Sequence, residues 1–421
     1  MLSPYGIFLA FNTLYNVFPW LANKFDLNDI FPLFAETSVL NTQLLLASSA
    51  NLCFGLVFLF RFHRVVLIAP PGTLTSLRRR NFVLLTFPLF LATCLLSAKY
   101  GWHAYTFAIS EDAESLGGLF TLTAYVKYCF VAVYIYYLYR FDFDRWASVL
   151  LAEELIVMVV DGGRTTVFPI TFLTLMIVYD RFAAKSVRRK VYIGLALAIC
   201  ASVLVRSFVI HDESFALRVI APVSVEGMMG AYPSLQSIYA ISHGQHPAYT
   251  YGSSYCVDPF FWLLPQGHMR DQLSFLQGWV RSILPAVPDT QFAPMGGFYF
   301  LAEAVAAFSY FGPALVTACF AFALVSIENR KNKHRLFYLV WTSTIGILFV
   351  KTIFGNAFKL FAIEWLVVLT FVLGASIRNG MVTAGLTKSR WLQQHYLSRG
   401  GTDSPAGTVT IHLPNDGKRR T

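Results

Sequence analysis

Four basic side chains fall at or near the ends of long apolar stretches, where they could bind an anion. They are Arg164, Arg206, Lys351 and Lys359. A charge at membrane depth costs at least about 2.5 kcal/mol, so such groups usually face a cavity and a partner. Four cations at one depth favour an anionic ligand at that face of a membrane. The alternative is that they pair with carboxylates such as Glu303 and with lipid phosphates.

Arg164 is the most informative of these cations because of the residues around it. It lies in Asp161-Gly-Gly-Arg-Thr-Thr, between two apolar stretches of about 15 residues, each shorter than the roughly 20 that cross a bilayer. The turn is therefore expected to dip below the outer surface. Two glycines permit close backbone approach, so amide donors and one guanidinium could converge on a phosphate.

Glu303 is the candidate carboxylate, because it follows Gly296-Gly-Phe-Tyr-Phe-Leu-Ala at the start of an apolar stretch. If that stretch begins at the outer face of a membrane, Glu303 lies just inside the bilayer boundary. A carboxylate there is costly unless it has a partner or a task. It could pair with a neighbouring cation, or it could orient or activate a sugar hydroxyl.

Aromatic and small polar residues cluster in PAYTYGSSYCVDPFFWLLPQGHMRD, residues 247–271. Tyr251, Gly252 and Tyr255 suit a carbohydrate surface, although aromatic packing at a membrane interface explains them equally well. His268 and Arg270 follow in the same segment and add a candidate base and a further cation.

The elements that must position these residues are membrane helices. The 421 residues are 56% hydrophobic and 13% charged, and the mean hydropathy is +0.55, which excludes an ordinary soluble domain. About ten apolar stretches approach the length of a span, so we predict an all-α integral membrane protein. They lie near residues 4–22, 42–60, 81–99, 118–139, 146–160, 165–180, 191–210, 298–326, 336–352 and 357–376.

The basic residues between the spans predict the orientation. They concentrate in the connections 61–80, 181–190 and 330–335, which the positive-inside rule assigns to the cytoplasm, while the connection 24–36 is mostly acidic. The net charge of +10 is therefore a topology signal, and no nucleic-acid partner is expected. Both termini are then cytoplasmic.

Two regions lie outside the spans. Residues 211–297 contain no Lys and form one large outer loop, in which residues 271–284 predict an amphipathic helix along the membrane interface. We expect residues 1–377 to be one polytopic domain that includes this loop. Residues 378–421 are expected to be a cytoplasmic tail without structure, because the segment is polar and rich in Gly, Ser and Thr.

The sequence lacks the motifs of common soluble enzymes. It contains no GxxxxGK, HExxH or GxSxG, and its cysteines and histidines do not have metal-ligand spacing. We therefore predict no metal and no cofactor.

The chain resembles the Wzy-type O-antigen polymerases, also called oligosaccharide repeat-unit polymerases. The resemblance rests on GGRTT at 162–166, YGSSY at 251–255 and GGFYFLAEAVAAFSYFGPAL at 296–315, and in topology it covers about residues 4–377. One departure is Pro265-Gln-Gly-His-Met-Arg270, where relatives often have Pro-Arg. Which residue fills that basic role is therefore open.

The resemblance implies a GT-C-like membrane glycosyltransferase of the bacterial inner membrane. It would join undecaprenyl-diphosphate-linked oligosaccharides at the periplasmic face, and a chain-length regulator is a conceivable partner. Cations would stabilise the departing diphosphate: Arg164, with Arg206, Arg270 or Lys359. Glu303, or else His268, would activate the acceptor hydroxyl.

Three other functions stay open. An O-antigen ligase uses the same donor, but the His-Asn pair common in its long loop does not occur here. A lipid-linked oligosaccharide flippase or transporter would place cations in both leaflets, whereas these cluster outward. A membrane acyltransferase needs a histidine in or near a span, and none is evident.

Overall fold

The computed structural model describes most of the chain, and the described residues form helices and connecting segments with no strand among them. They are residues 4–24, 36–63, 65–68, 79–105, 117–161, 167–181, 186, 189–190, 192–194, 231–245, 247–264, 272–283, 300–350 and 352–399.

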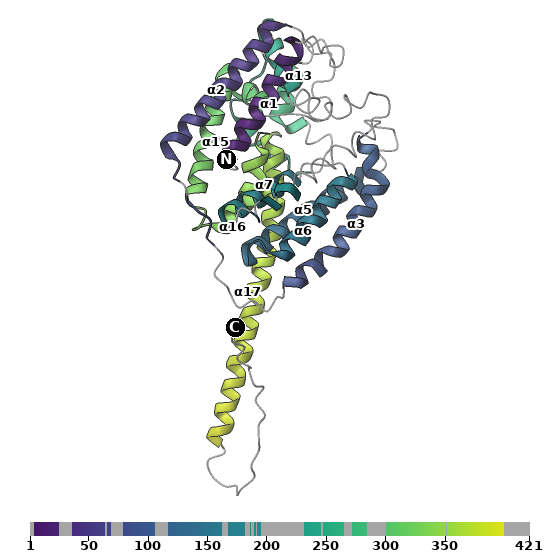
Figure 1. The fold of residues 1–421 in the computed structure, drawn as a ribbon, viewed down its shortest axis with the longest axis vertical. Helices are drawn as coiled ribbons and strands as arrows, with labels where there is room; N and C mark the ends of the chain where they lie inside the picture. The colour runs from purple at the N-terminus through teal and green to yellow at the C-terminus, as the bar shows by residue number, and fades with distance from the viewer. Residues whose placement is uncertain are drawn as a thin grey trace. The chain divides into compact units, whose positions relative to one another are not determined.

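Helix α2 (Thr37–Arg61) is the centre of one group of helices. α15 (Gly312–Asn329) runs along it and α1 (Pro4–Lys24) packs on it, as Figure 1 shows. The buried residues of α2 recur at the spacing of one helical face: Val39, Leu40, Gln43, Leu46, Ala47, Ala50 and Phe54. Leu45 and Leu52, on the other face, are exposed. α2 is therefore apolar on both faces and buries only one of them.

A second group contains α3 (Arg79–Tyr105), α5 (Gly117–Phe141), α6 (Arg145–Asp161) and α7 (Val167–Arg181). α3 packs against α5 and α6, and α6 packs against α7. Every residue of α5 from 130 to 138 is buried, so α5 is covered on all sides along that length. This burial makes α5 the central helix of the second group.

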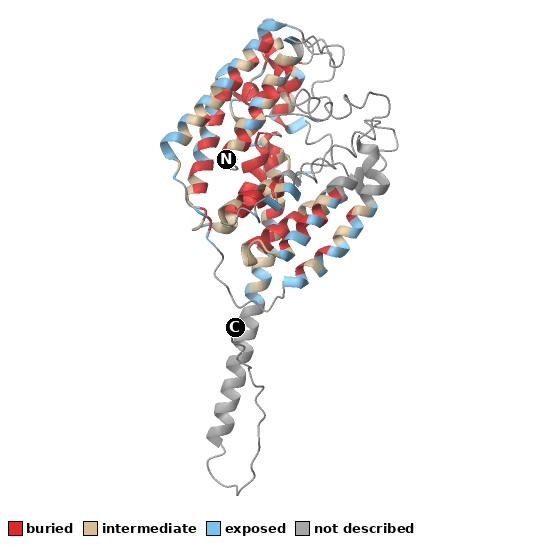
Figure 2. Cartoon of the chain, viewed as in Figure 1, coloured by how far each residue is buried: buried red, intermediate tan, exposed pale blue. Residues whose placement is uncertain are grey.

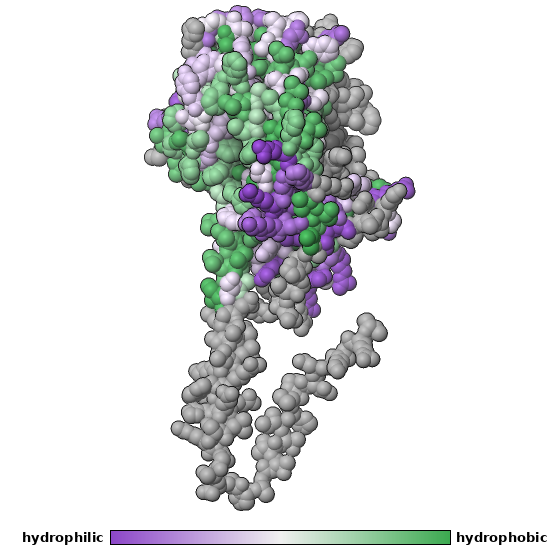
Figure 3. Space-filling model, turned by 90° about the vertical axis from the view of Figure 1, so that its left-hand side faces the viewer, coloured by the Kyte–Doolittle hydropathy of each residue, from purple (hydrophilic) through white to green (hydrophobic). Residues whose placement is uncertain are grey.

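The outer faces of these helices are apolar. Residues along α2 and α3 are exposed on one side (Figure 2), and many of them are large and hydrophobic. Figure 3 shows a broad hydrophobic surface on one side of the molecule. Three described stretches are long and apolar enough to cross a membrane: Thr37–Arg61, Phe300–Asn329 and Phe354–Ile377. The protein is thus helical with an exterior suited to lipid.

The stretch Phe300–Asn329 is not the single straight span that we predicted for residues 298–326. α14 (Phe300–Phe308) ends at the turn Ser309–Phe311, where Ser309 has a positive φ of 54°, and α15 runs back beside α14. This reversal brings Gly312 against the Ala304 carbonyl, where a Cβ atom would collide with backbone. The stretch that we expected to be one span is therefore a helical hairpin of α14 and α15.

Aromatic contacts place the start of α14 beside the middle of α15. Phe300 and Phe349 lie 5.5 Å apart between ring centroids, and Phe349 stacks on Phe320 of α15 at 3.8 Å. α14 therefore runs from the middle of the helical bundle toward the Ser309 turn. Glu303, in its first turn, therefore lies near the middle of the bundle.

The last two expected spans form a second reversal. α16 (Arg335–Trp341) continues through the π-helical turn Thr342–Gly346, and α17 (Phe354–Arg399) then runs back beside it. The rings of Phe337 and Phe361 lie 5.9 Å apart across this pair. The turn between α16 and α17 thus lies near Phe349, in the middle of the bundle.

Helices lie at all the other expected spans except 191–210, where only residues 192–194 are described. α17 is helical as far as Arg399, so the segment 378–399 has structure that we did not predict. Its part beyond Val368 belongs to a second compact unit, Leu369–Thr421. Residues 400–421 lie outside the described part of the chain.

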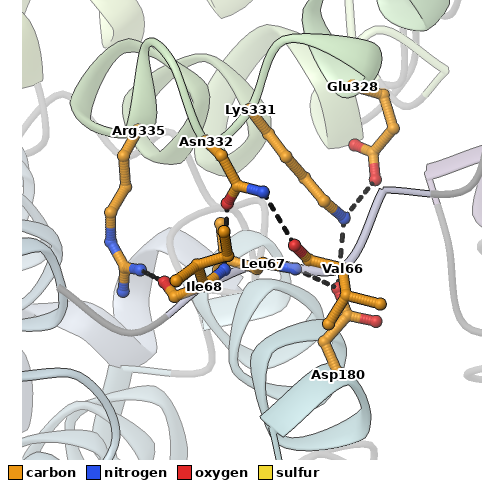
Figure 4. Close-up of polar contacts among 8 residues, drawn as sticks. All are labelled: Val66, Leu67, Ile68, Asp180, Glu328, Lys331, Asn332 and Arg335. Carbon is orange, nitrogen blue, oxygen red and sulfur yellow. Dashed lines mark hydrogen bonds and ion pairs between the residues drawn. The ribbon is translucent and has the colours of Figure 1, made fainter.

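A buried cation joins the ends of α7 and α15 (Figure 4). Lys331 is 4% exposed, and its Nζ donates to Asp180 Oδ2 at 3.1 Å and to Glu328 Oε1 at 2.9 Å. Asp180 Oδ2 also accepts the Leu67 N–H at 3.3 Å. We call this cluster the polar clamp; it comprises Val66, Leu67, Ile68, Asp180, Glu328, Lys331, Asn332 and Arg335.

The polar clamp also holds the extended segment that follows α2. Asn332 Oδ1 accepts the Ile68 N–H at 2.9 Å, and Asn332 Nδ2 donates to the Val66 carbonyl at 2.8 Å. Arg335 donates to the Ile68 carbonyl and lies 3.3 Å from Asp142 Oδ1. Segments far apart in the sequence are therefore fixed at one end of the bundle.

The contacts at the two ends of the bundle agree with the prediction that successive connections lie on opposite sides. The polar clamp unites residues of the connections 61–80 and 330–335 with the end of α7, all of which the charge pattern assigned to one side. Elsewhere Glu36 and His243, from two segments assigned to the other side, lie 3.4 Å apart. The grouping is confirmed for these residues, and its orientation in a membrane stays a prediction.

Candidate functional site

Two of the segments singled out in the sequence meet along α14. The Thr250 N–H donates to the Ala306 carbonyl at 3.0 Å, and the Tyr249 hydroxyl donates to Ser309 Oγ at 3.2 Å. In a continuous helix the Ala306 carbonyl would accept the N–H four residues later, but α14 ends at Phe308. The carbonyl is therefore available to Thr250. The break in the helix thus supplies the acceptor that docks the outer loop.

A tight turn fixes the loop at this point. Tyr251 and Gly252 have positive φ values of 45° and 86°, and the Ser253 N–H donates to the Thr250 carbonyl at 2.8 Å. Gly252 packs on Phe308, where a Cβ would lie 3.0 Å from the ring. Only glycine combines this backbone conformation with so close an approach.

Glu303 is buried beneath this loop, at 1% exposure. Its Oε2 accepts the N–H of Phe354, the first residue of α17, at 2.7 Å. The N–H groups of a first helical turn lack partners in their own helix, and a carboxylate there also interacts favourably with the helix dipole. Glu303 therefore joins the start of α14 to the start of α17.

Tyr255 lies next to this carboxylate. Its ring is 5.7 Å from that of Phe354, and its buried hydroxyl has no hydrogen-bond partner among the described residues. Burial, and then the Glu303 carboxylate, raise the pKa of the Tyr255 phenol well above its ordinary value. The phenol therefore keeps its proton at neutral pH and is available as a donor.

Asp258 is a buried acid of this region that the sequence analysis missed. Its Oδ1 accepts the Phe275 N–H at 2.8 Å, and its Oδ2 accepts the Leu276 N–H and the Ser274 hydroxyl, both at 2.9 Å. These groups begin α13 (Phe275–Ile283), so Asp258 caps that helix from another part of the loop. The only local indication in the sequence is an Asp-Pro pair, which is common in turns.

The apolar face of α13 is buried in the protein, whereas we predicted that residues 271–284 lay this face along the membrane interface. Its apolar residues Leu276, Trp279, Val280 and Ile283 are buried and pack in one cluster with Ala240, Ala306 and Ile353. The amphipathic pattern was correct, but its apolar face covers the protein core. The described parts of the outer loop are therefore a packed layer over α14.

The structure brings together four of the predicted site residues: Tyr251, Gly252, Tyr255 and Glu303. Lys359 lies in the second turn of α17 with its ammonium 5.3 Å from the centroid of the Tyr125 ring, so at least part of its charge faces an aromatic side chain. The remaining predicted residues lie outside the described part of the chain: Arg164, Arg206, His268, Arg270 and Lys351.

The arrangement could act on a hydroxyl group. A buried carboxylate and a protonated phenol stand together, and the residues 247–255 lead from the Ser309 turn to them. Among the described residues, no group of three His, Cys, Asp or Glu side chains could hold a metal ion. Comparisons with known protein families, with curated proteins and with solved structures find no match for this chain.

Proposed function

We propose that this protein polymerises lipid-diphosphate-linked oligosaccharide repeat units at the outer face of the bacterial inner membrane. In this scheme, the anomeric carbon of the growing chain leaves its undecaprenyl diphosphate and bonds to a hydroxyl of the next repeat. The hydroxyl proton passes to a protein base. The GT-C-like fold with about ten spans, the periplasmic location and the inner-membrane assignment are parts of this proposal.

The observation that supports the proposal is a contact between two of the segments on which the resemblance to the polymerase family rests. Residues 251–255 and 296–315 are far apart in the sequence, yet Gly252 packs on Phe308, and Tyr249 and Thr250, just before the first segment, bond to Ser309 and Ala306. A resemblance in two independent short segments gains weight when both contribute to one buried site. The aromatic and hydroxyl-bearing residues of that site suit a glycan.

The proposed roles follow from the chemistry of the reaction. Glu303 would accept the proton of the acceptor hydroxyl, with His268 as the alternative base. Arg164, aided by Arg206, Arg270 or Lys359, would hold the departing diphosphate, because preorganised cations stabilise charge that develops on a leaving group. Lys351 precedes α17 in the sequence and is a further candidate for this role.

Deletion in the host, followed by electrophoresis of the lipopolysaccharide, tests the proposal. Loss of a polymerase leaves the lipid A core with a single repeat in place of a ladder. Loss of a ligase or a flippase leaves the core without any repeat. A ladder that persists, or a core that carries no repeat, would contradict the polymerase assignment.

An arginine replacement tests the proposed diphosphate site in the same assay. Arg164→Ala should abolish the ladder at a normal protein level. Arg164→Lys should restore it poorly, because a point charge cannot reproduce bidentate contact with phosphate oxygens. An intact ladder with Arg164→Ala would remove this residue from the site.

A further inference from the structure

We propose that Tyr249, Tyr251 and Tyr310 form a binding surface for a neutral sugar ring of the glycan. We call these three residues the tyrosine shelf. The inference rests on the proposed function for the identity of the glycan, and it adds a second subsite to the one that contains Glu303.

The three residues come together because the outer loop docks on the end of α14. The rings of Tyr249 and Tyr251 lie 6.3 Å apart between centroids, with their planes inclined by 64°. The Tyr249 hydroxyl donates to Ser309 at 3.2 Å, and Tyr310 is the next residue after Ser309 in the turn that ends α14. Tyr251 is 78% exposed and Tyr310 is 38% exposed, so ring faces remain available to a ligand.

The backbone at the tyrosine shelf is held in unfavourable conformations. Tyr251 and Ser309 both have positive φ, and Asp142 is the only other described residue besides glycine that does. The turn at Tyr251 and Gly252 favours Gly or Asn at both central positions. A bulky tyrosine there costs free energy without burying its ring, and such strain tends to persist at functional sites.

The charge of the surface selects the kind of ligand. Residues 247–257 and 300–312 contain one charged residue, Glu303, and its side chain is buried. An uncharged surface of aromatic faces and phenolic hydroxyls matches a sugar ring, which offers C–H groups on its faces and hydroxyls at its edge. These two described stretches offer no ion pair to an anionic phosphate or to an acidic protein.

The position of the tyrosine shelf defines which sugar it would hold. Phe308, the last residue of α14, follows Glu303 by roughly 7 Å along the helix axis, and Tyr310 lies in the turn beyond it. A ring on the tyrosine shelf is therefore not the ring that reacts at Glu303, but a neighbouring sugar of the same chain. Loss of the tyrosine shelf should therefore weaken substrate binding more than it slows the chemical step.

Tyr251→Gly is the decisive variant, because it removes the ring and relieves the backbone at once. With full-length protein and lipid-diphosphate-linked repeats, we expect KM to rise about tenfold and kcat to change less than about twofold. Thermal stability should be equal or higher. Tyr251→Phe should retain most of the affinity, and Phe260→Ala serves as the control, since Phe260 is an exposed aromatic of the same loop outside the shelf.

A binding measurement separates this inference from the proposed function. Saturation-transfer NMR with the free repeat-unit oligosaccharide reports binding whether or not the protein extends chains. If wild type fails to polymerise but transfers saturation to the oligosaccharide, and Tyr251→Gly does not, the polymerase proposal fails and the tyrosine shelf stands. Equal transfer by both proteins, or an unchanged KM in a stable Tyr251→Gly variant, would overturn the tyrosine shelf.

Discussion

Replacement of Glu303 by glutamine separates a catalytic role of this residue from a purely structural one. The carboxylate accepts the Phe354 N–H at 2.7 Å, and a glutamine amide oxygen can accept the same bond. The exchange keeps the size of the side chain and the acceptor of this bond. Glu303→Gln should therefore fold and accumulate almost normally.

Glu303→Ala should behave differently. It leaves the Phe354 N–H without its acceptor and opens a void beside the buried start of α17. The unpaired amide and the void together cost about 2–4 kcal/mol. The alanine variant should thus lose abundance or thermal stability, and its activity alone cannot distinguish the two roles.

Chain extension by purified protein at matched amounts is the assay. If Glu303 takes the acceptor proton, Glu303→Gln should slow the chemical step by about 100-fold to 10,000-fold. Glu364→Gln is the matched control. Glu364 is a buried carboxylate of α17 that accepts the Ser343 hydroxyl at 3.1 Å, and glutamine preserves that bond as well. A full rate with Glu303→Gln would refute the catalytic reasoning.

Three further changes test the fold, each by thermal unfolding in detergent. Gly312→Ala should cost about 1–3 kcal/mol because the new methyl group meets backbone, whereas Gly374→Ala, which enters open space, should be neutral or stabilising. Asp258→Ala should lower the free energy of unfolding by about 1–3 kcal/mol, because three donors at the start of α13 lose their acceptor. An unchanged melting temperature would show that this cap does not stabilise the protein. Lys331→Met should cost about 3–5 kcal/mol, because it removes the cation shared by the buried Glu328 and the half-buried Asp180. Arg79→Met breaks a pair whose arginine is 53% exposed and should cost at most about 1 kcal/mol; equal losses would contradict the burial argument.

The positions of most helices could be predicted from the sequence. Apolar length alone gives α1, α2 and α3 to within a few residues, because a membrane protein must satisfy its backbone groups inside helices. Positive charges also marked the connections that meet at one end. Their partners could not be foreseen, since Asp142, Asp180 and Glu328 come from three different connections or helix ends.

The hairpin of α14 and α15 could not be predicted from hydropathy, because both arms are apolar. Local chemistry did contain an indication. Ser309-Tyr-Phe-Gly-Pro313 places Gly-Pro inside an apolar run, and Pro313 occupies the first turn of α15, where proline is tolerated. A length criterion treats such a run as one span, whereas the turn chemistry divides it.

We predicted that Glu303 lies just inside the bilayer boundary and either pairs with a cation or acts on a sugar hydroxyl. In the structure Glu303 is buried, and the partner that it has is the Phe354 N–H, which we did not predict. The partner is a backbone group that becomes available only because α17 begins beside α14. Sequence patterns identify charged side chains that are costly to place in an apolar environment, but they do not reveal which helix ends will lie next to them.

The depth of Glu303 constrains any reaction that uses it. The carboxylate lies in the first turn of α14, beside the middle of α15, and under the proposed function we expect a substrate to approach it from the Ser309 end of the hairpin. Residues 249–255 dock on the Ser309 end of α14, and they contain hydroxyl groups at Tyr249, Thr250 and Ser254. A glycan entering along this path would exchange water for these hydroxyls one sugar at a time, whereas a lipid tail would gain nothing from them. The arrangement therefore favours the sugar end of a lipid-linked substrate as the part that approaches Glu303.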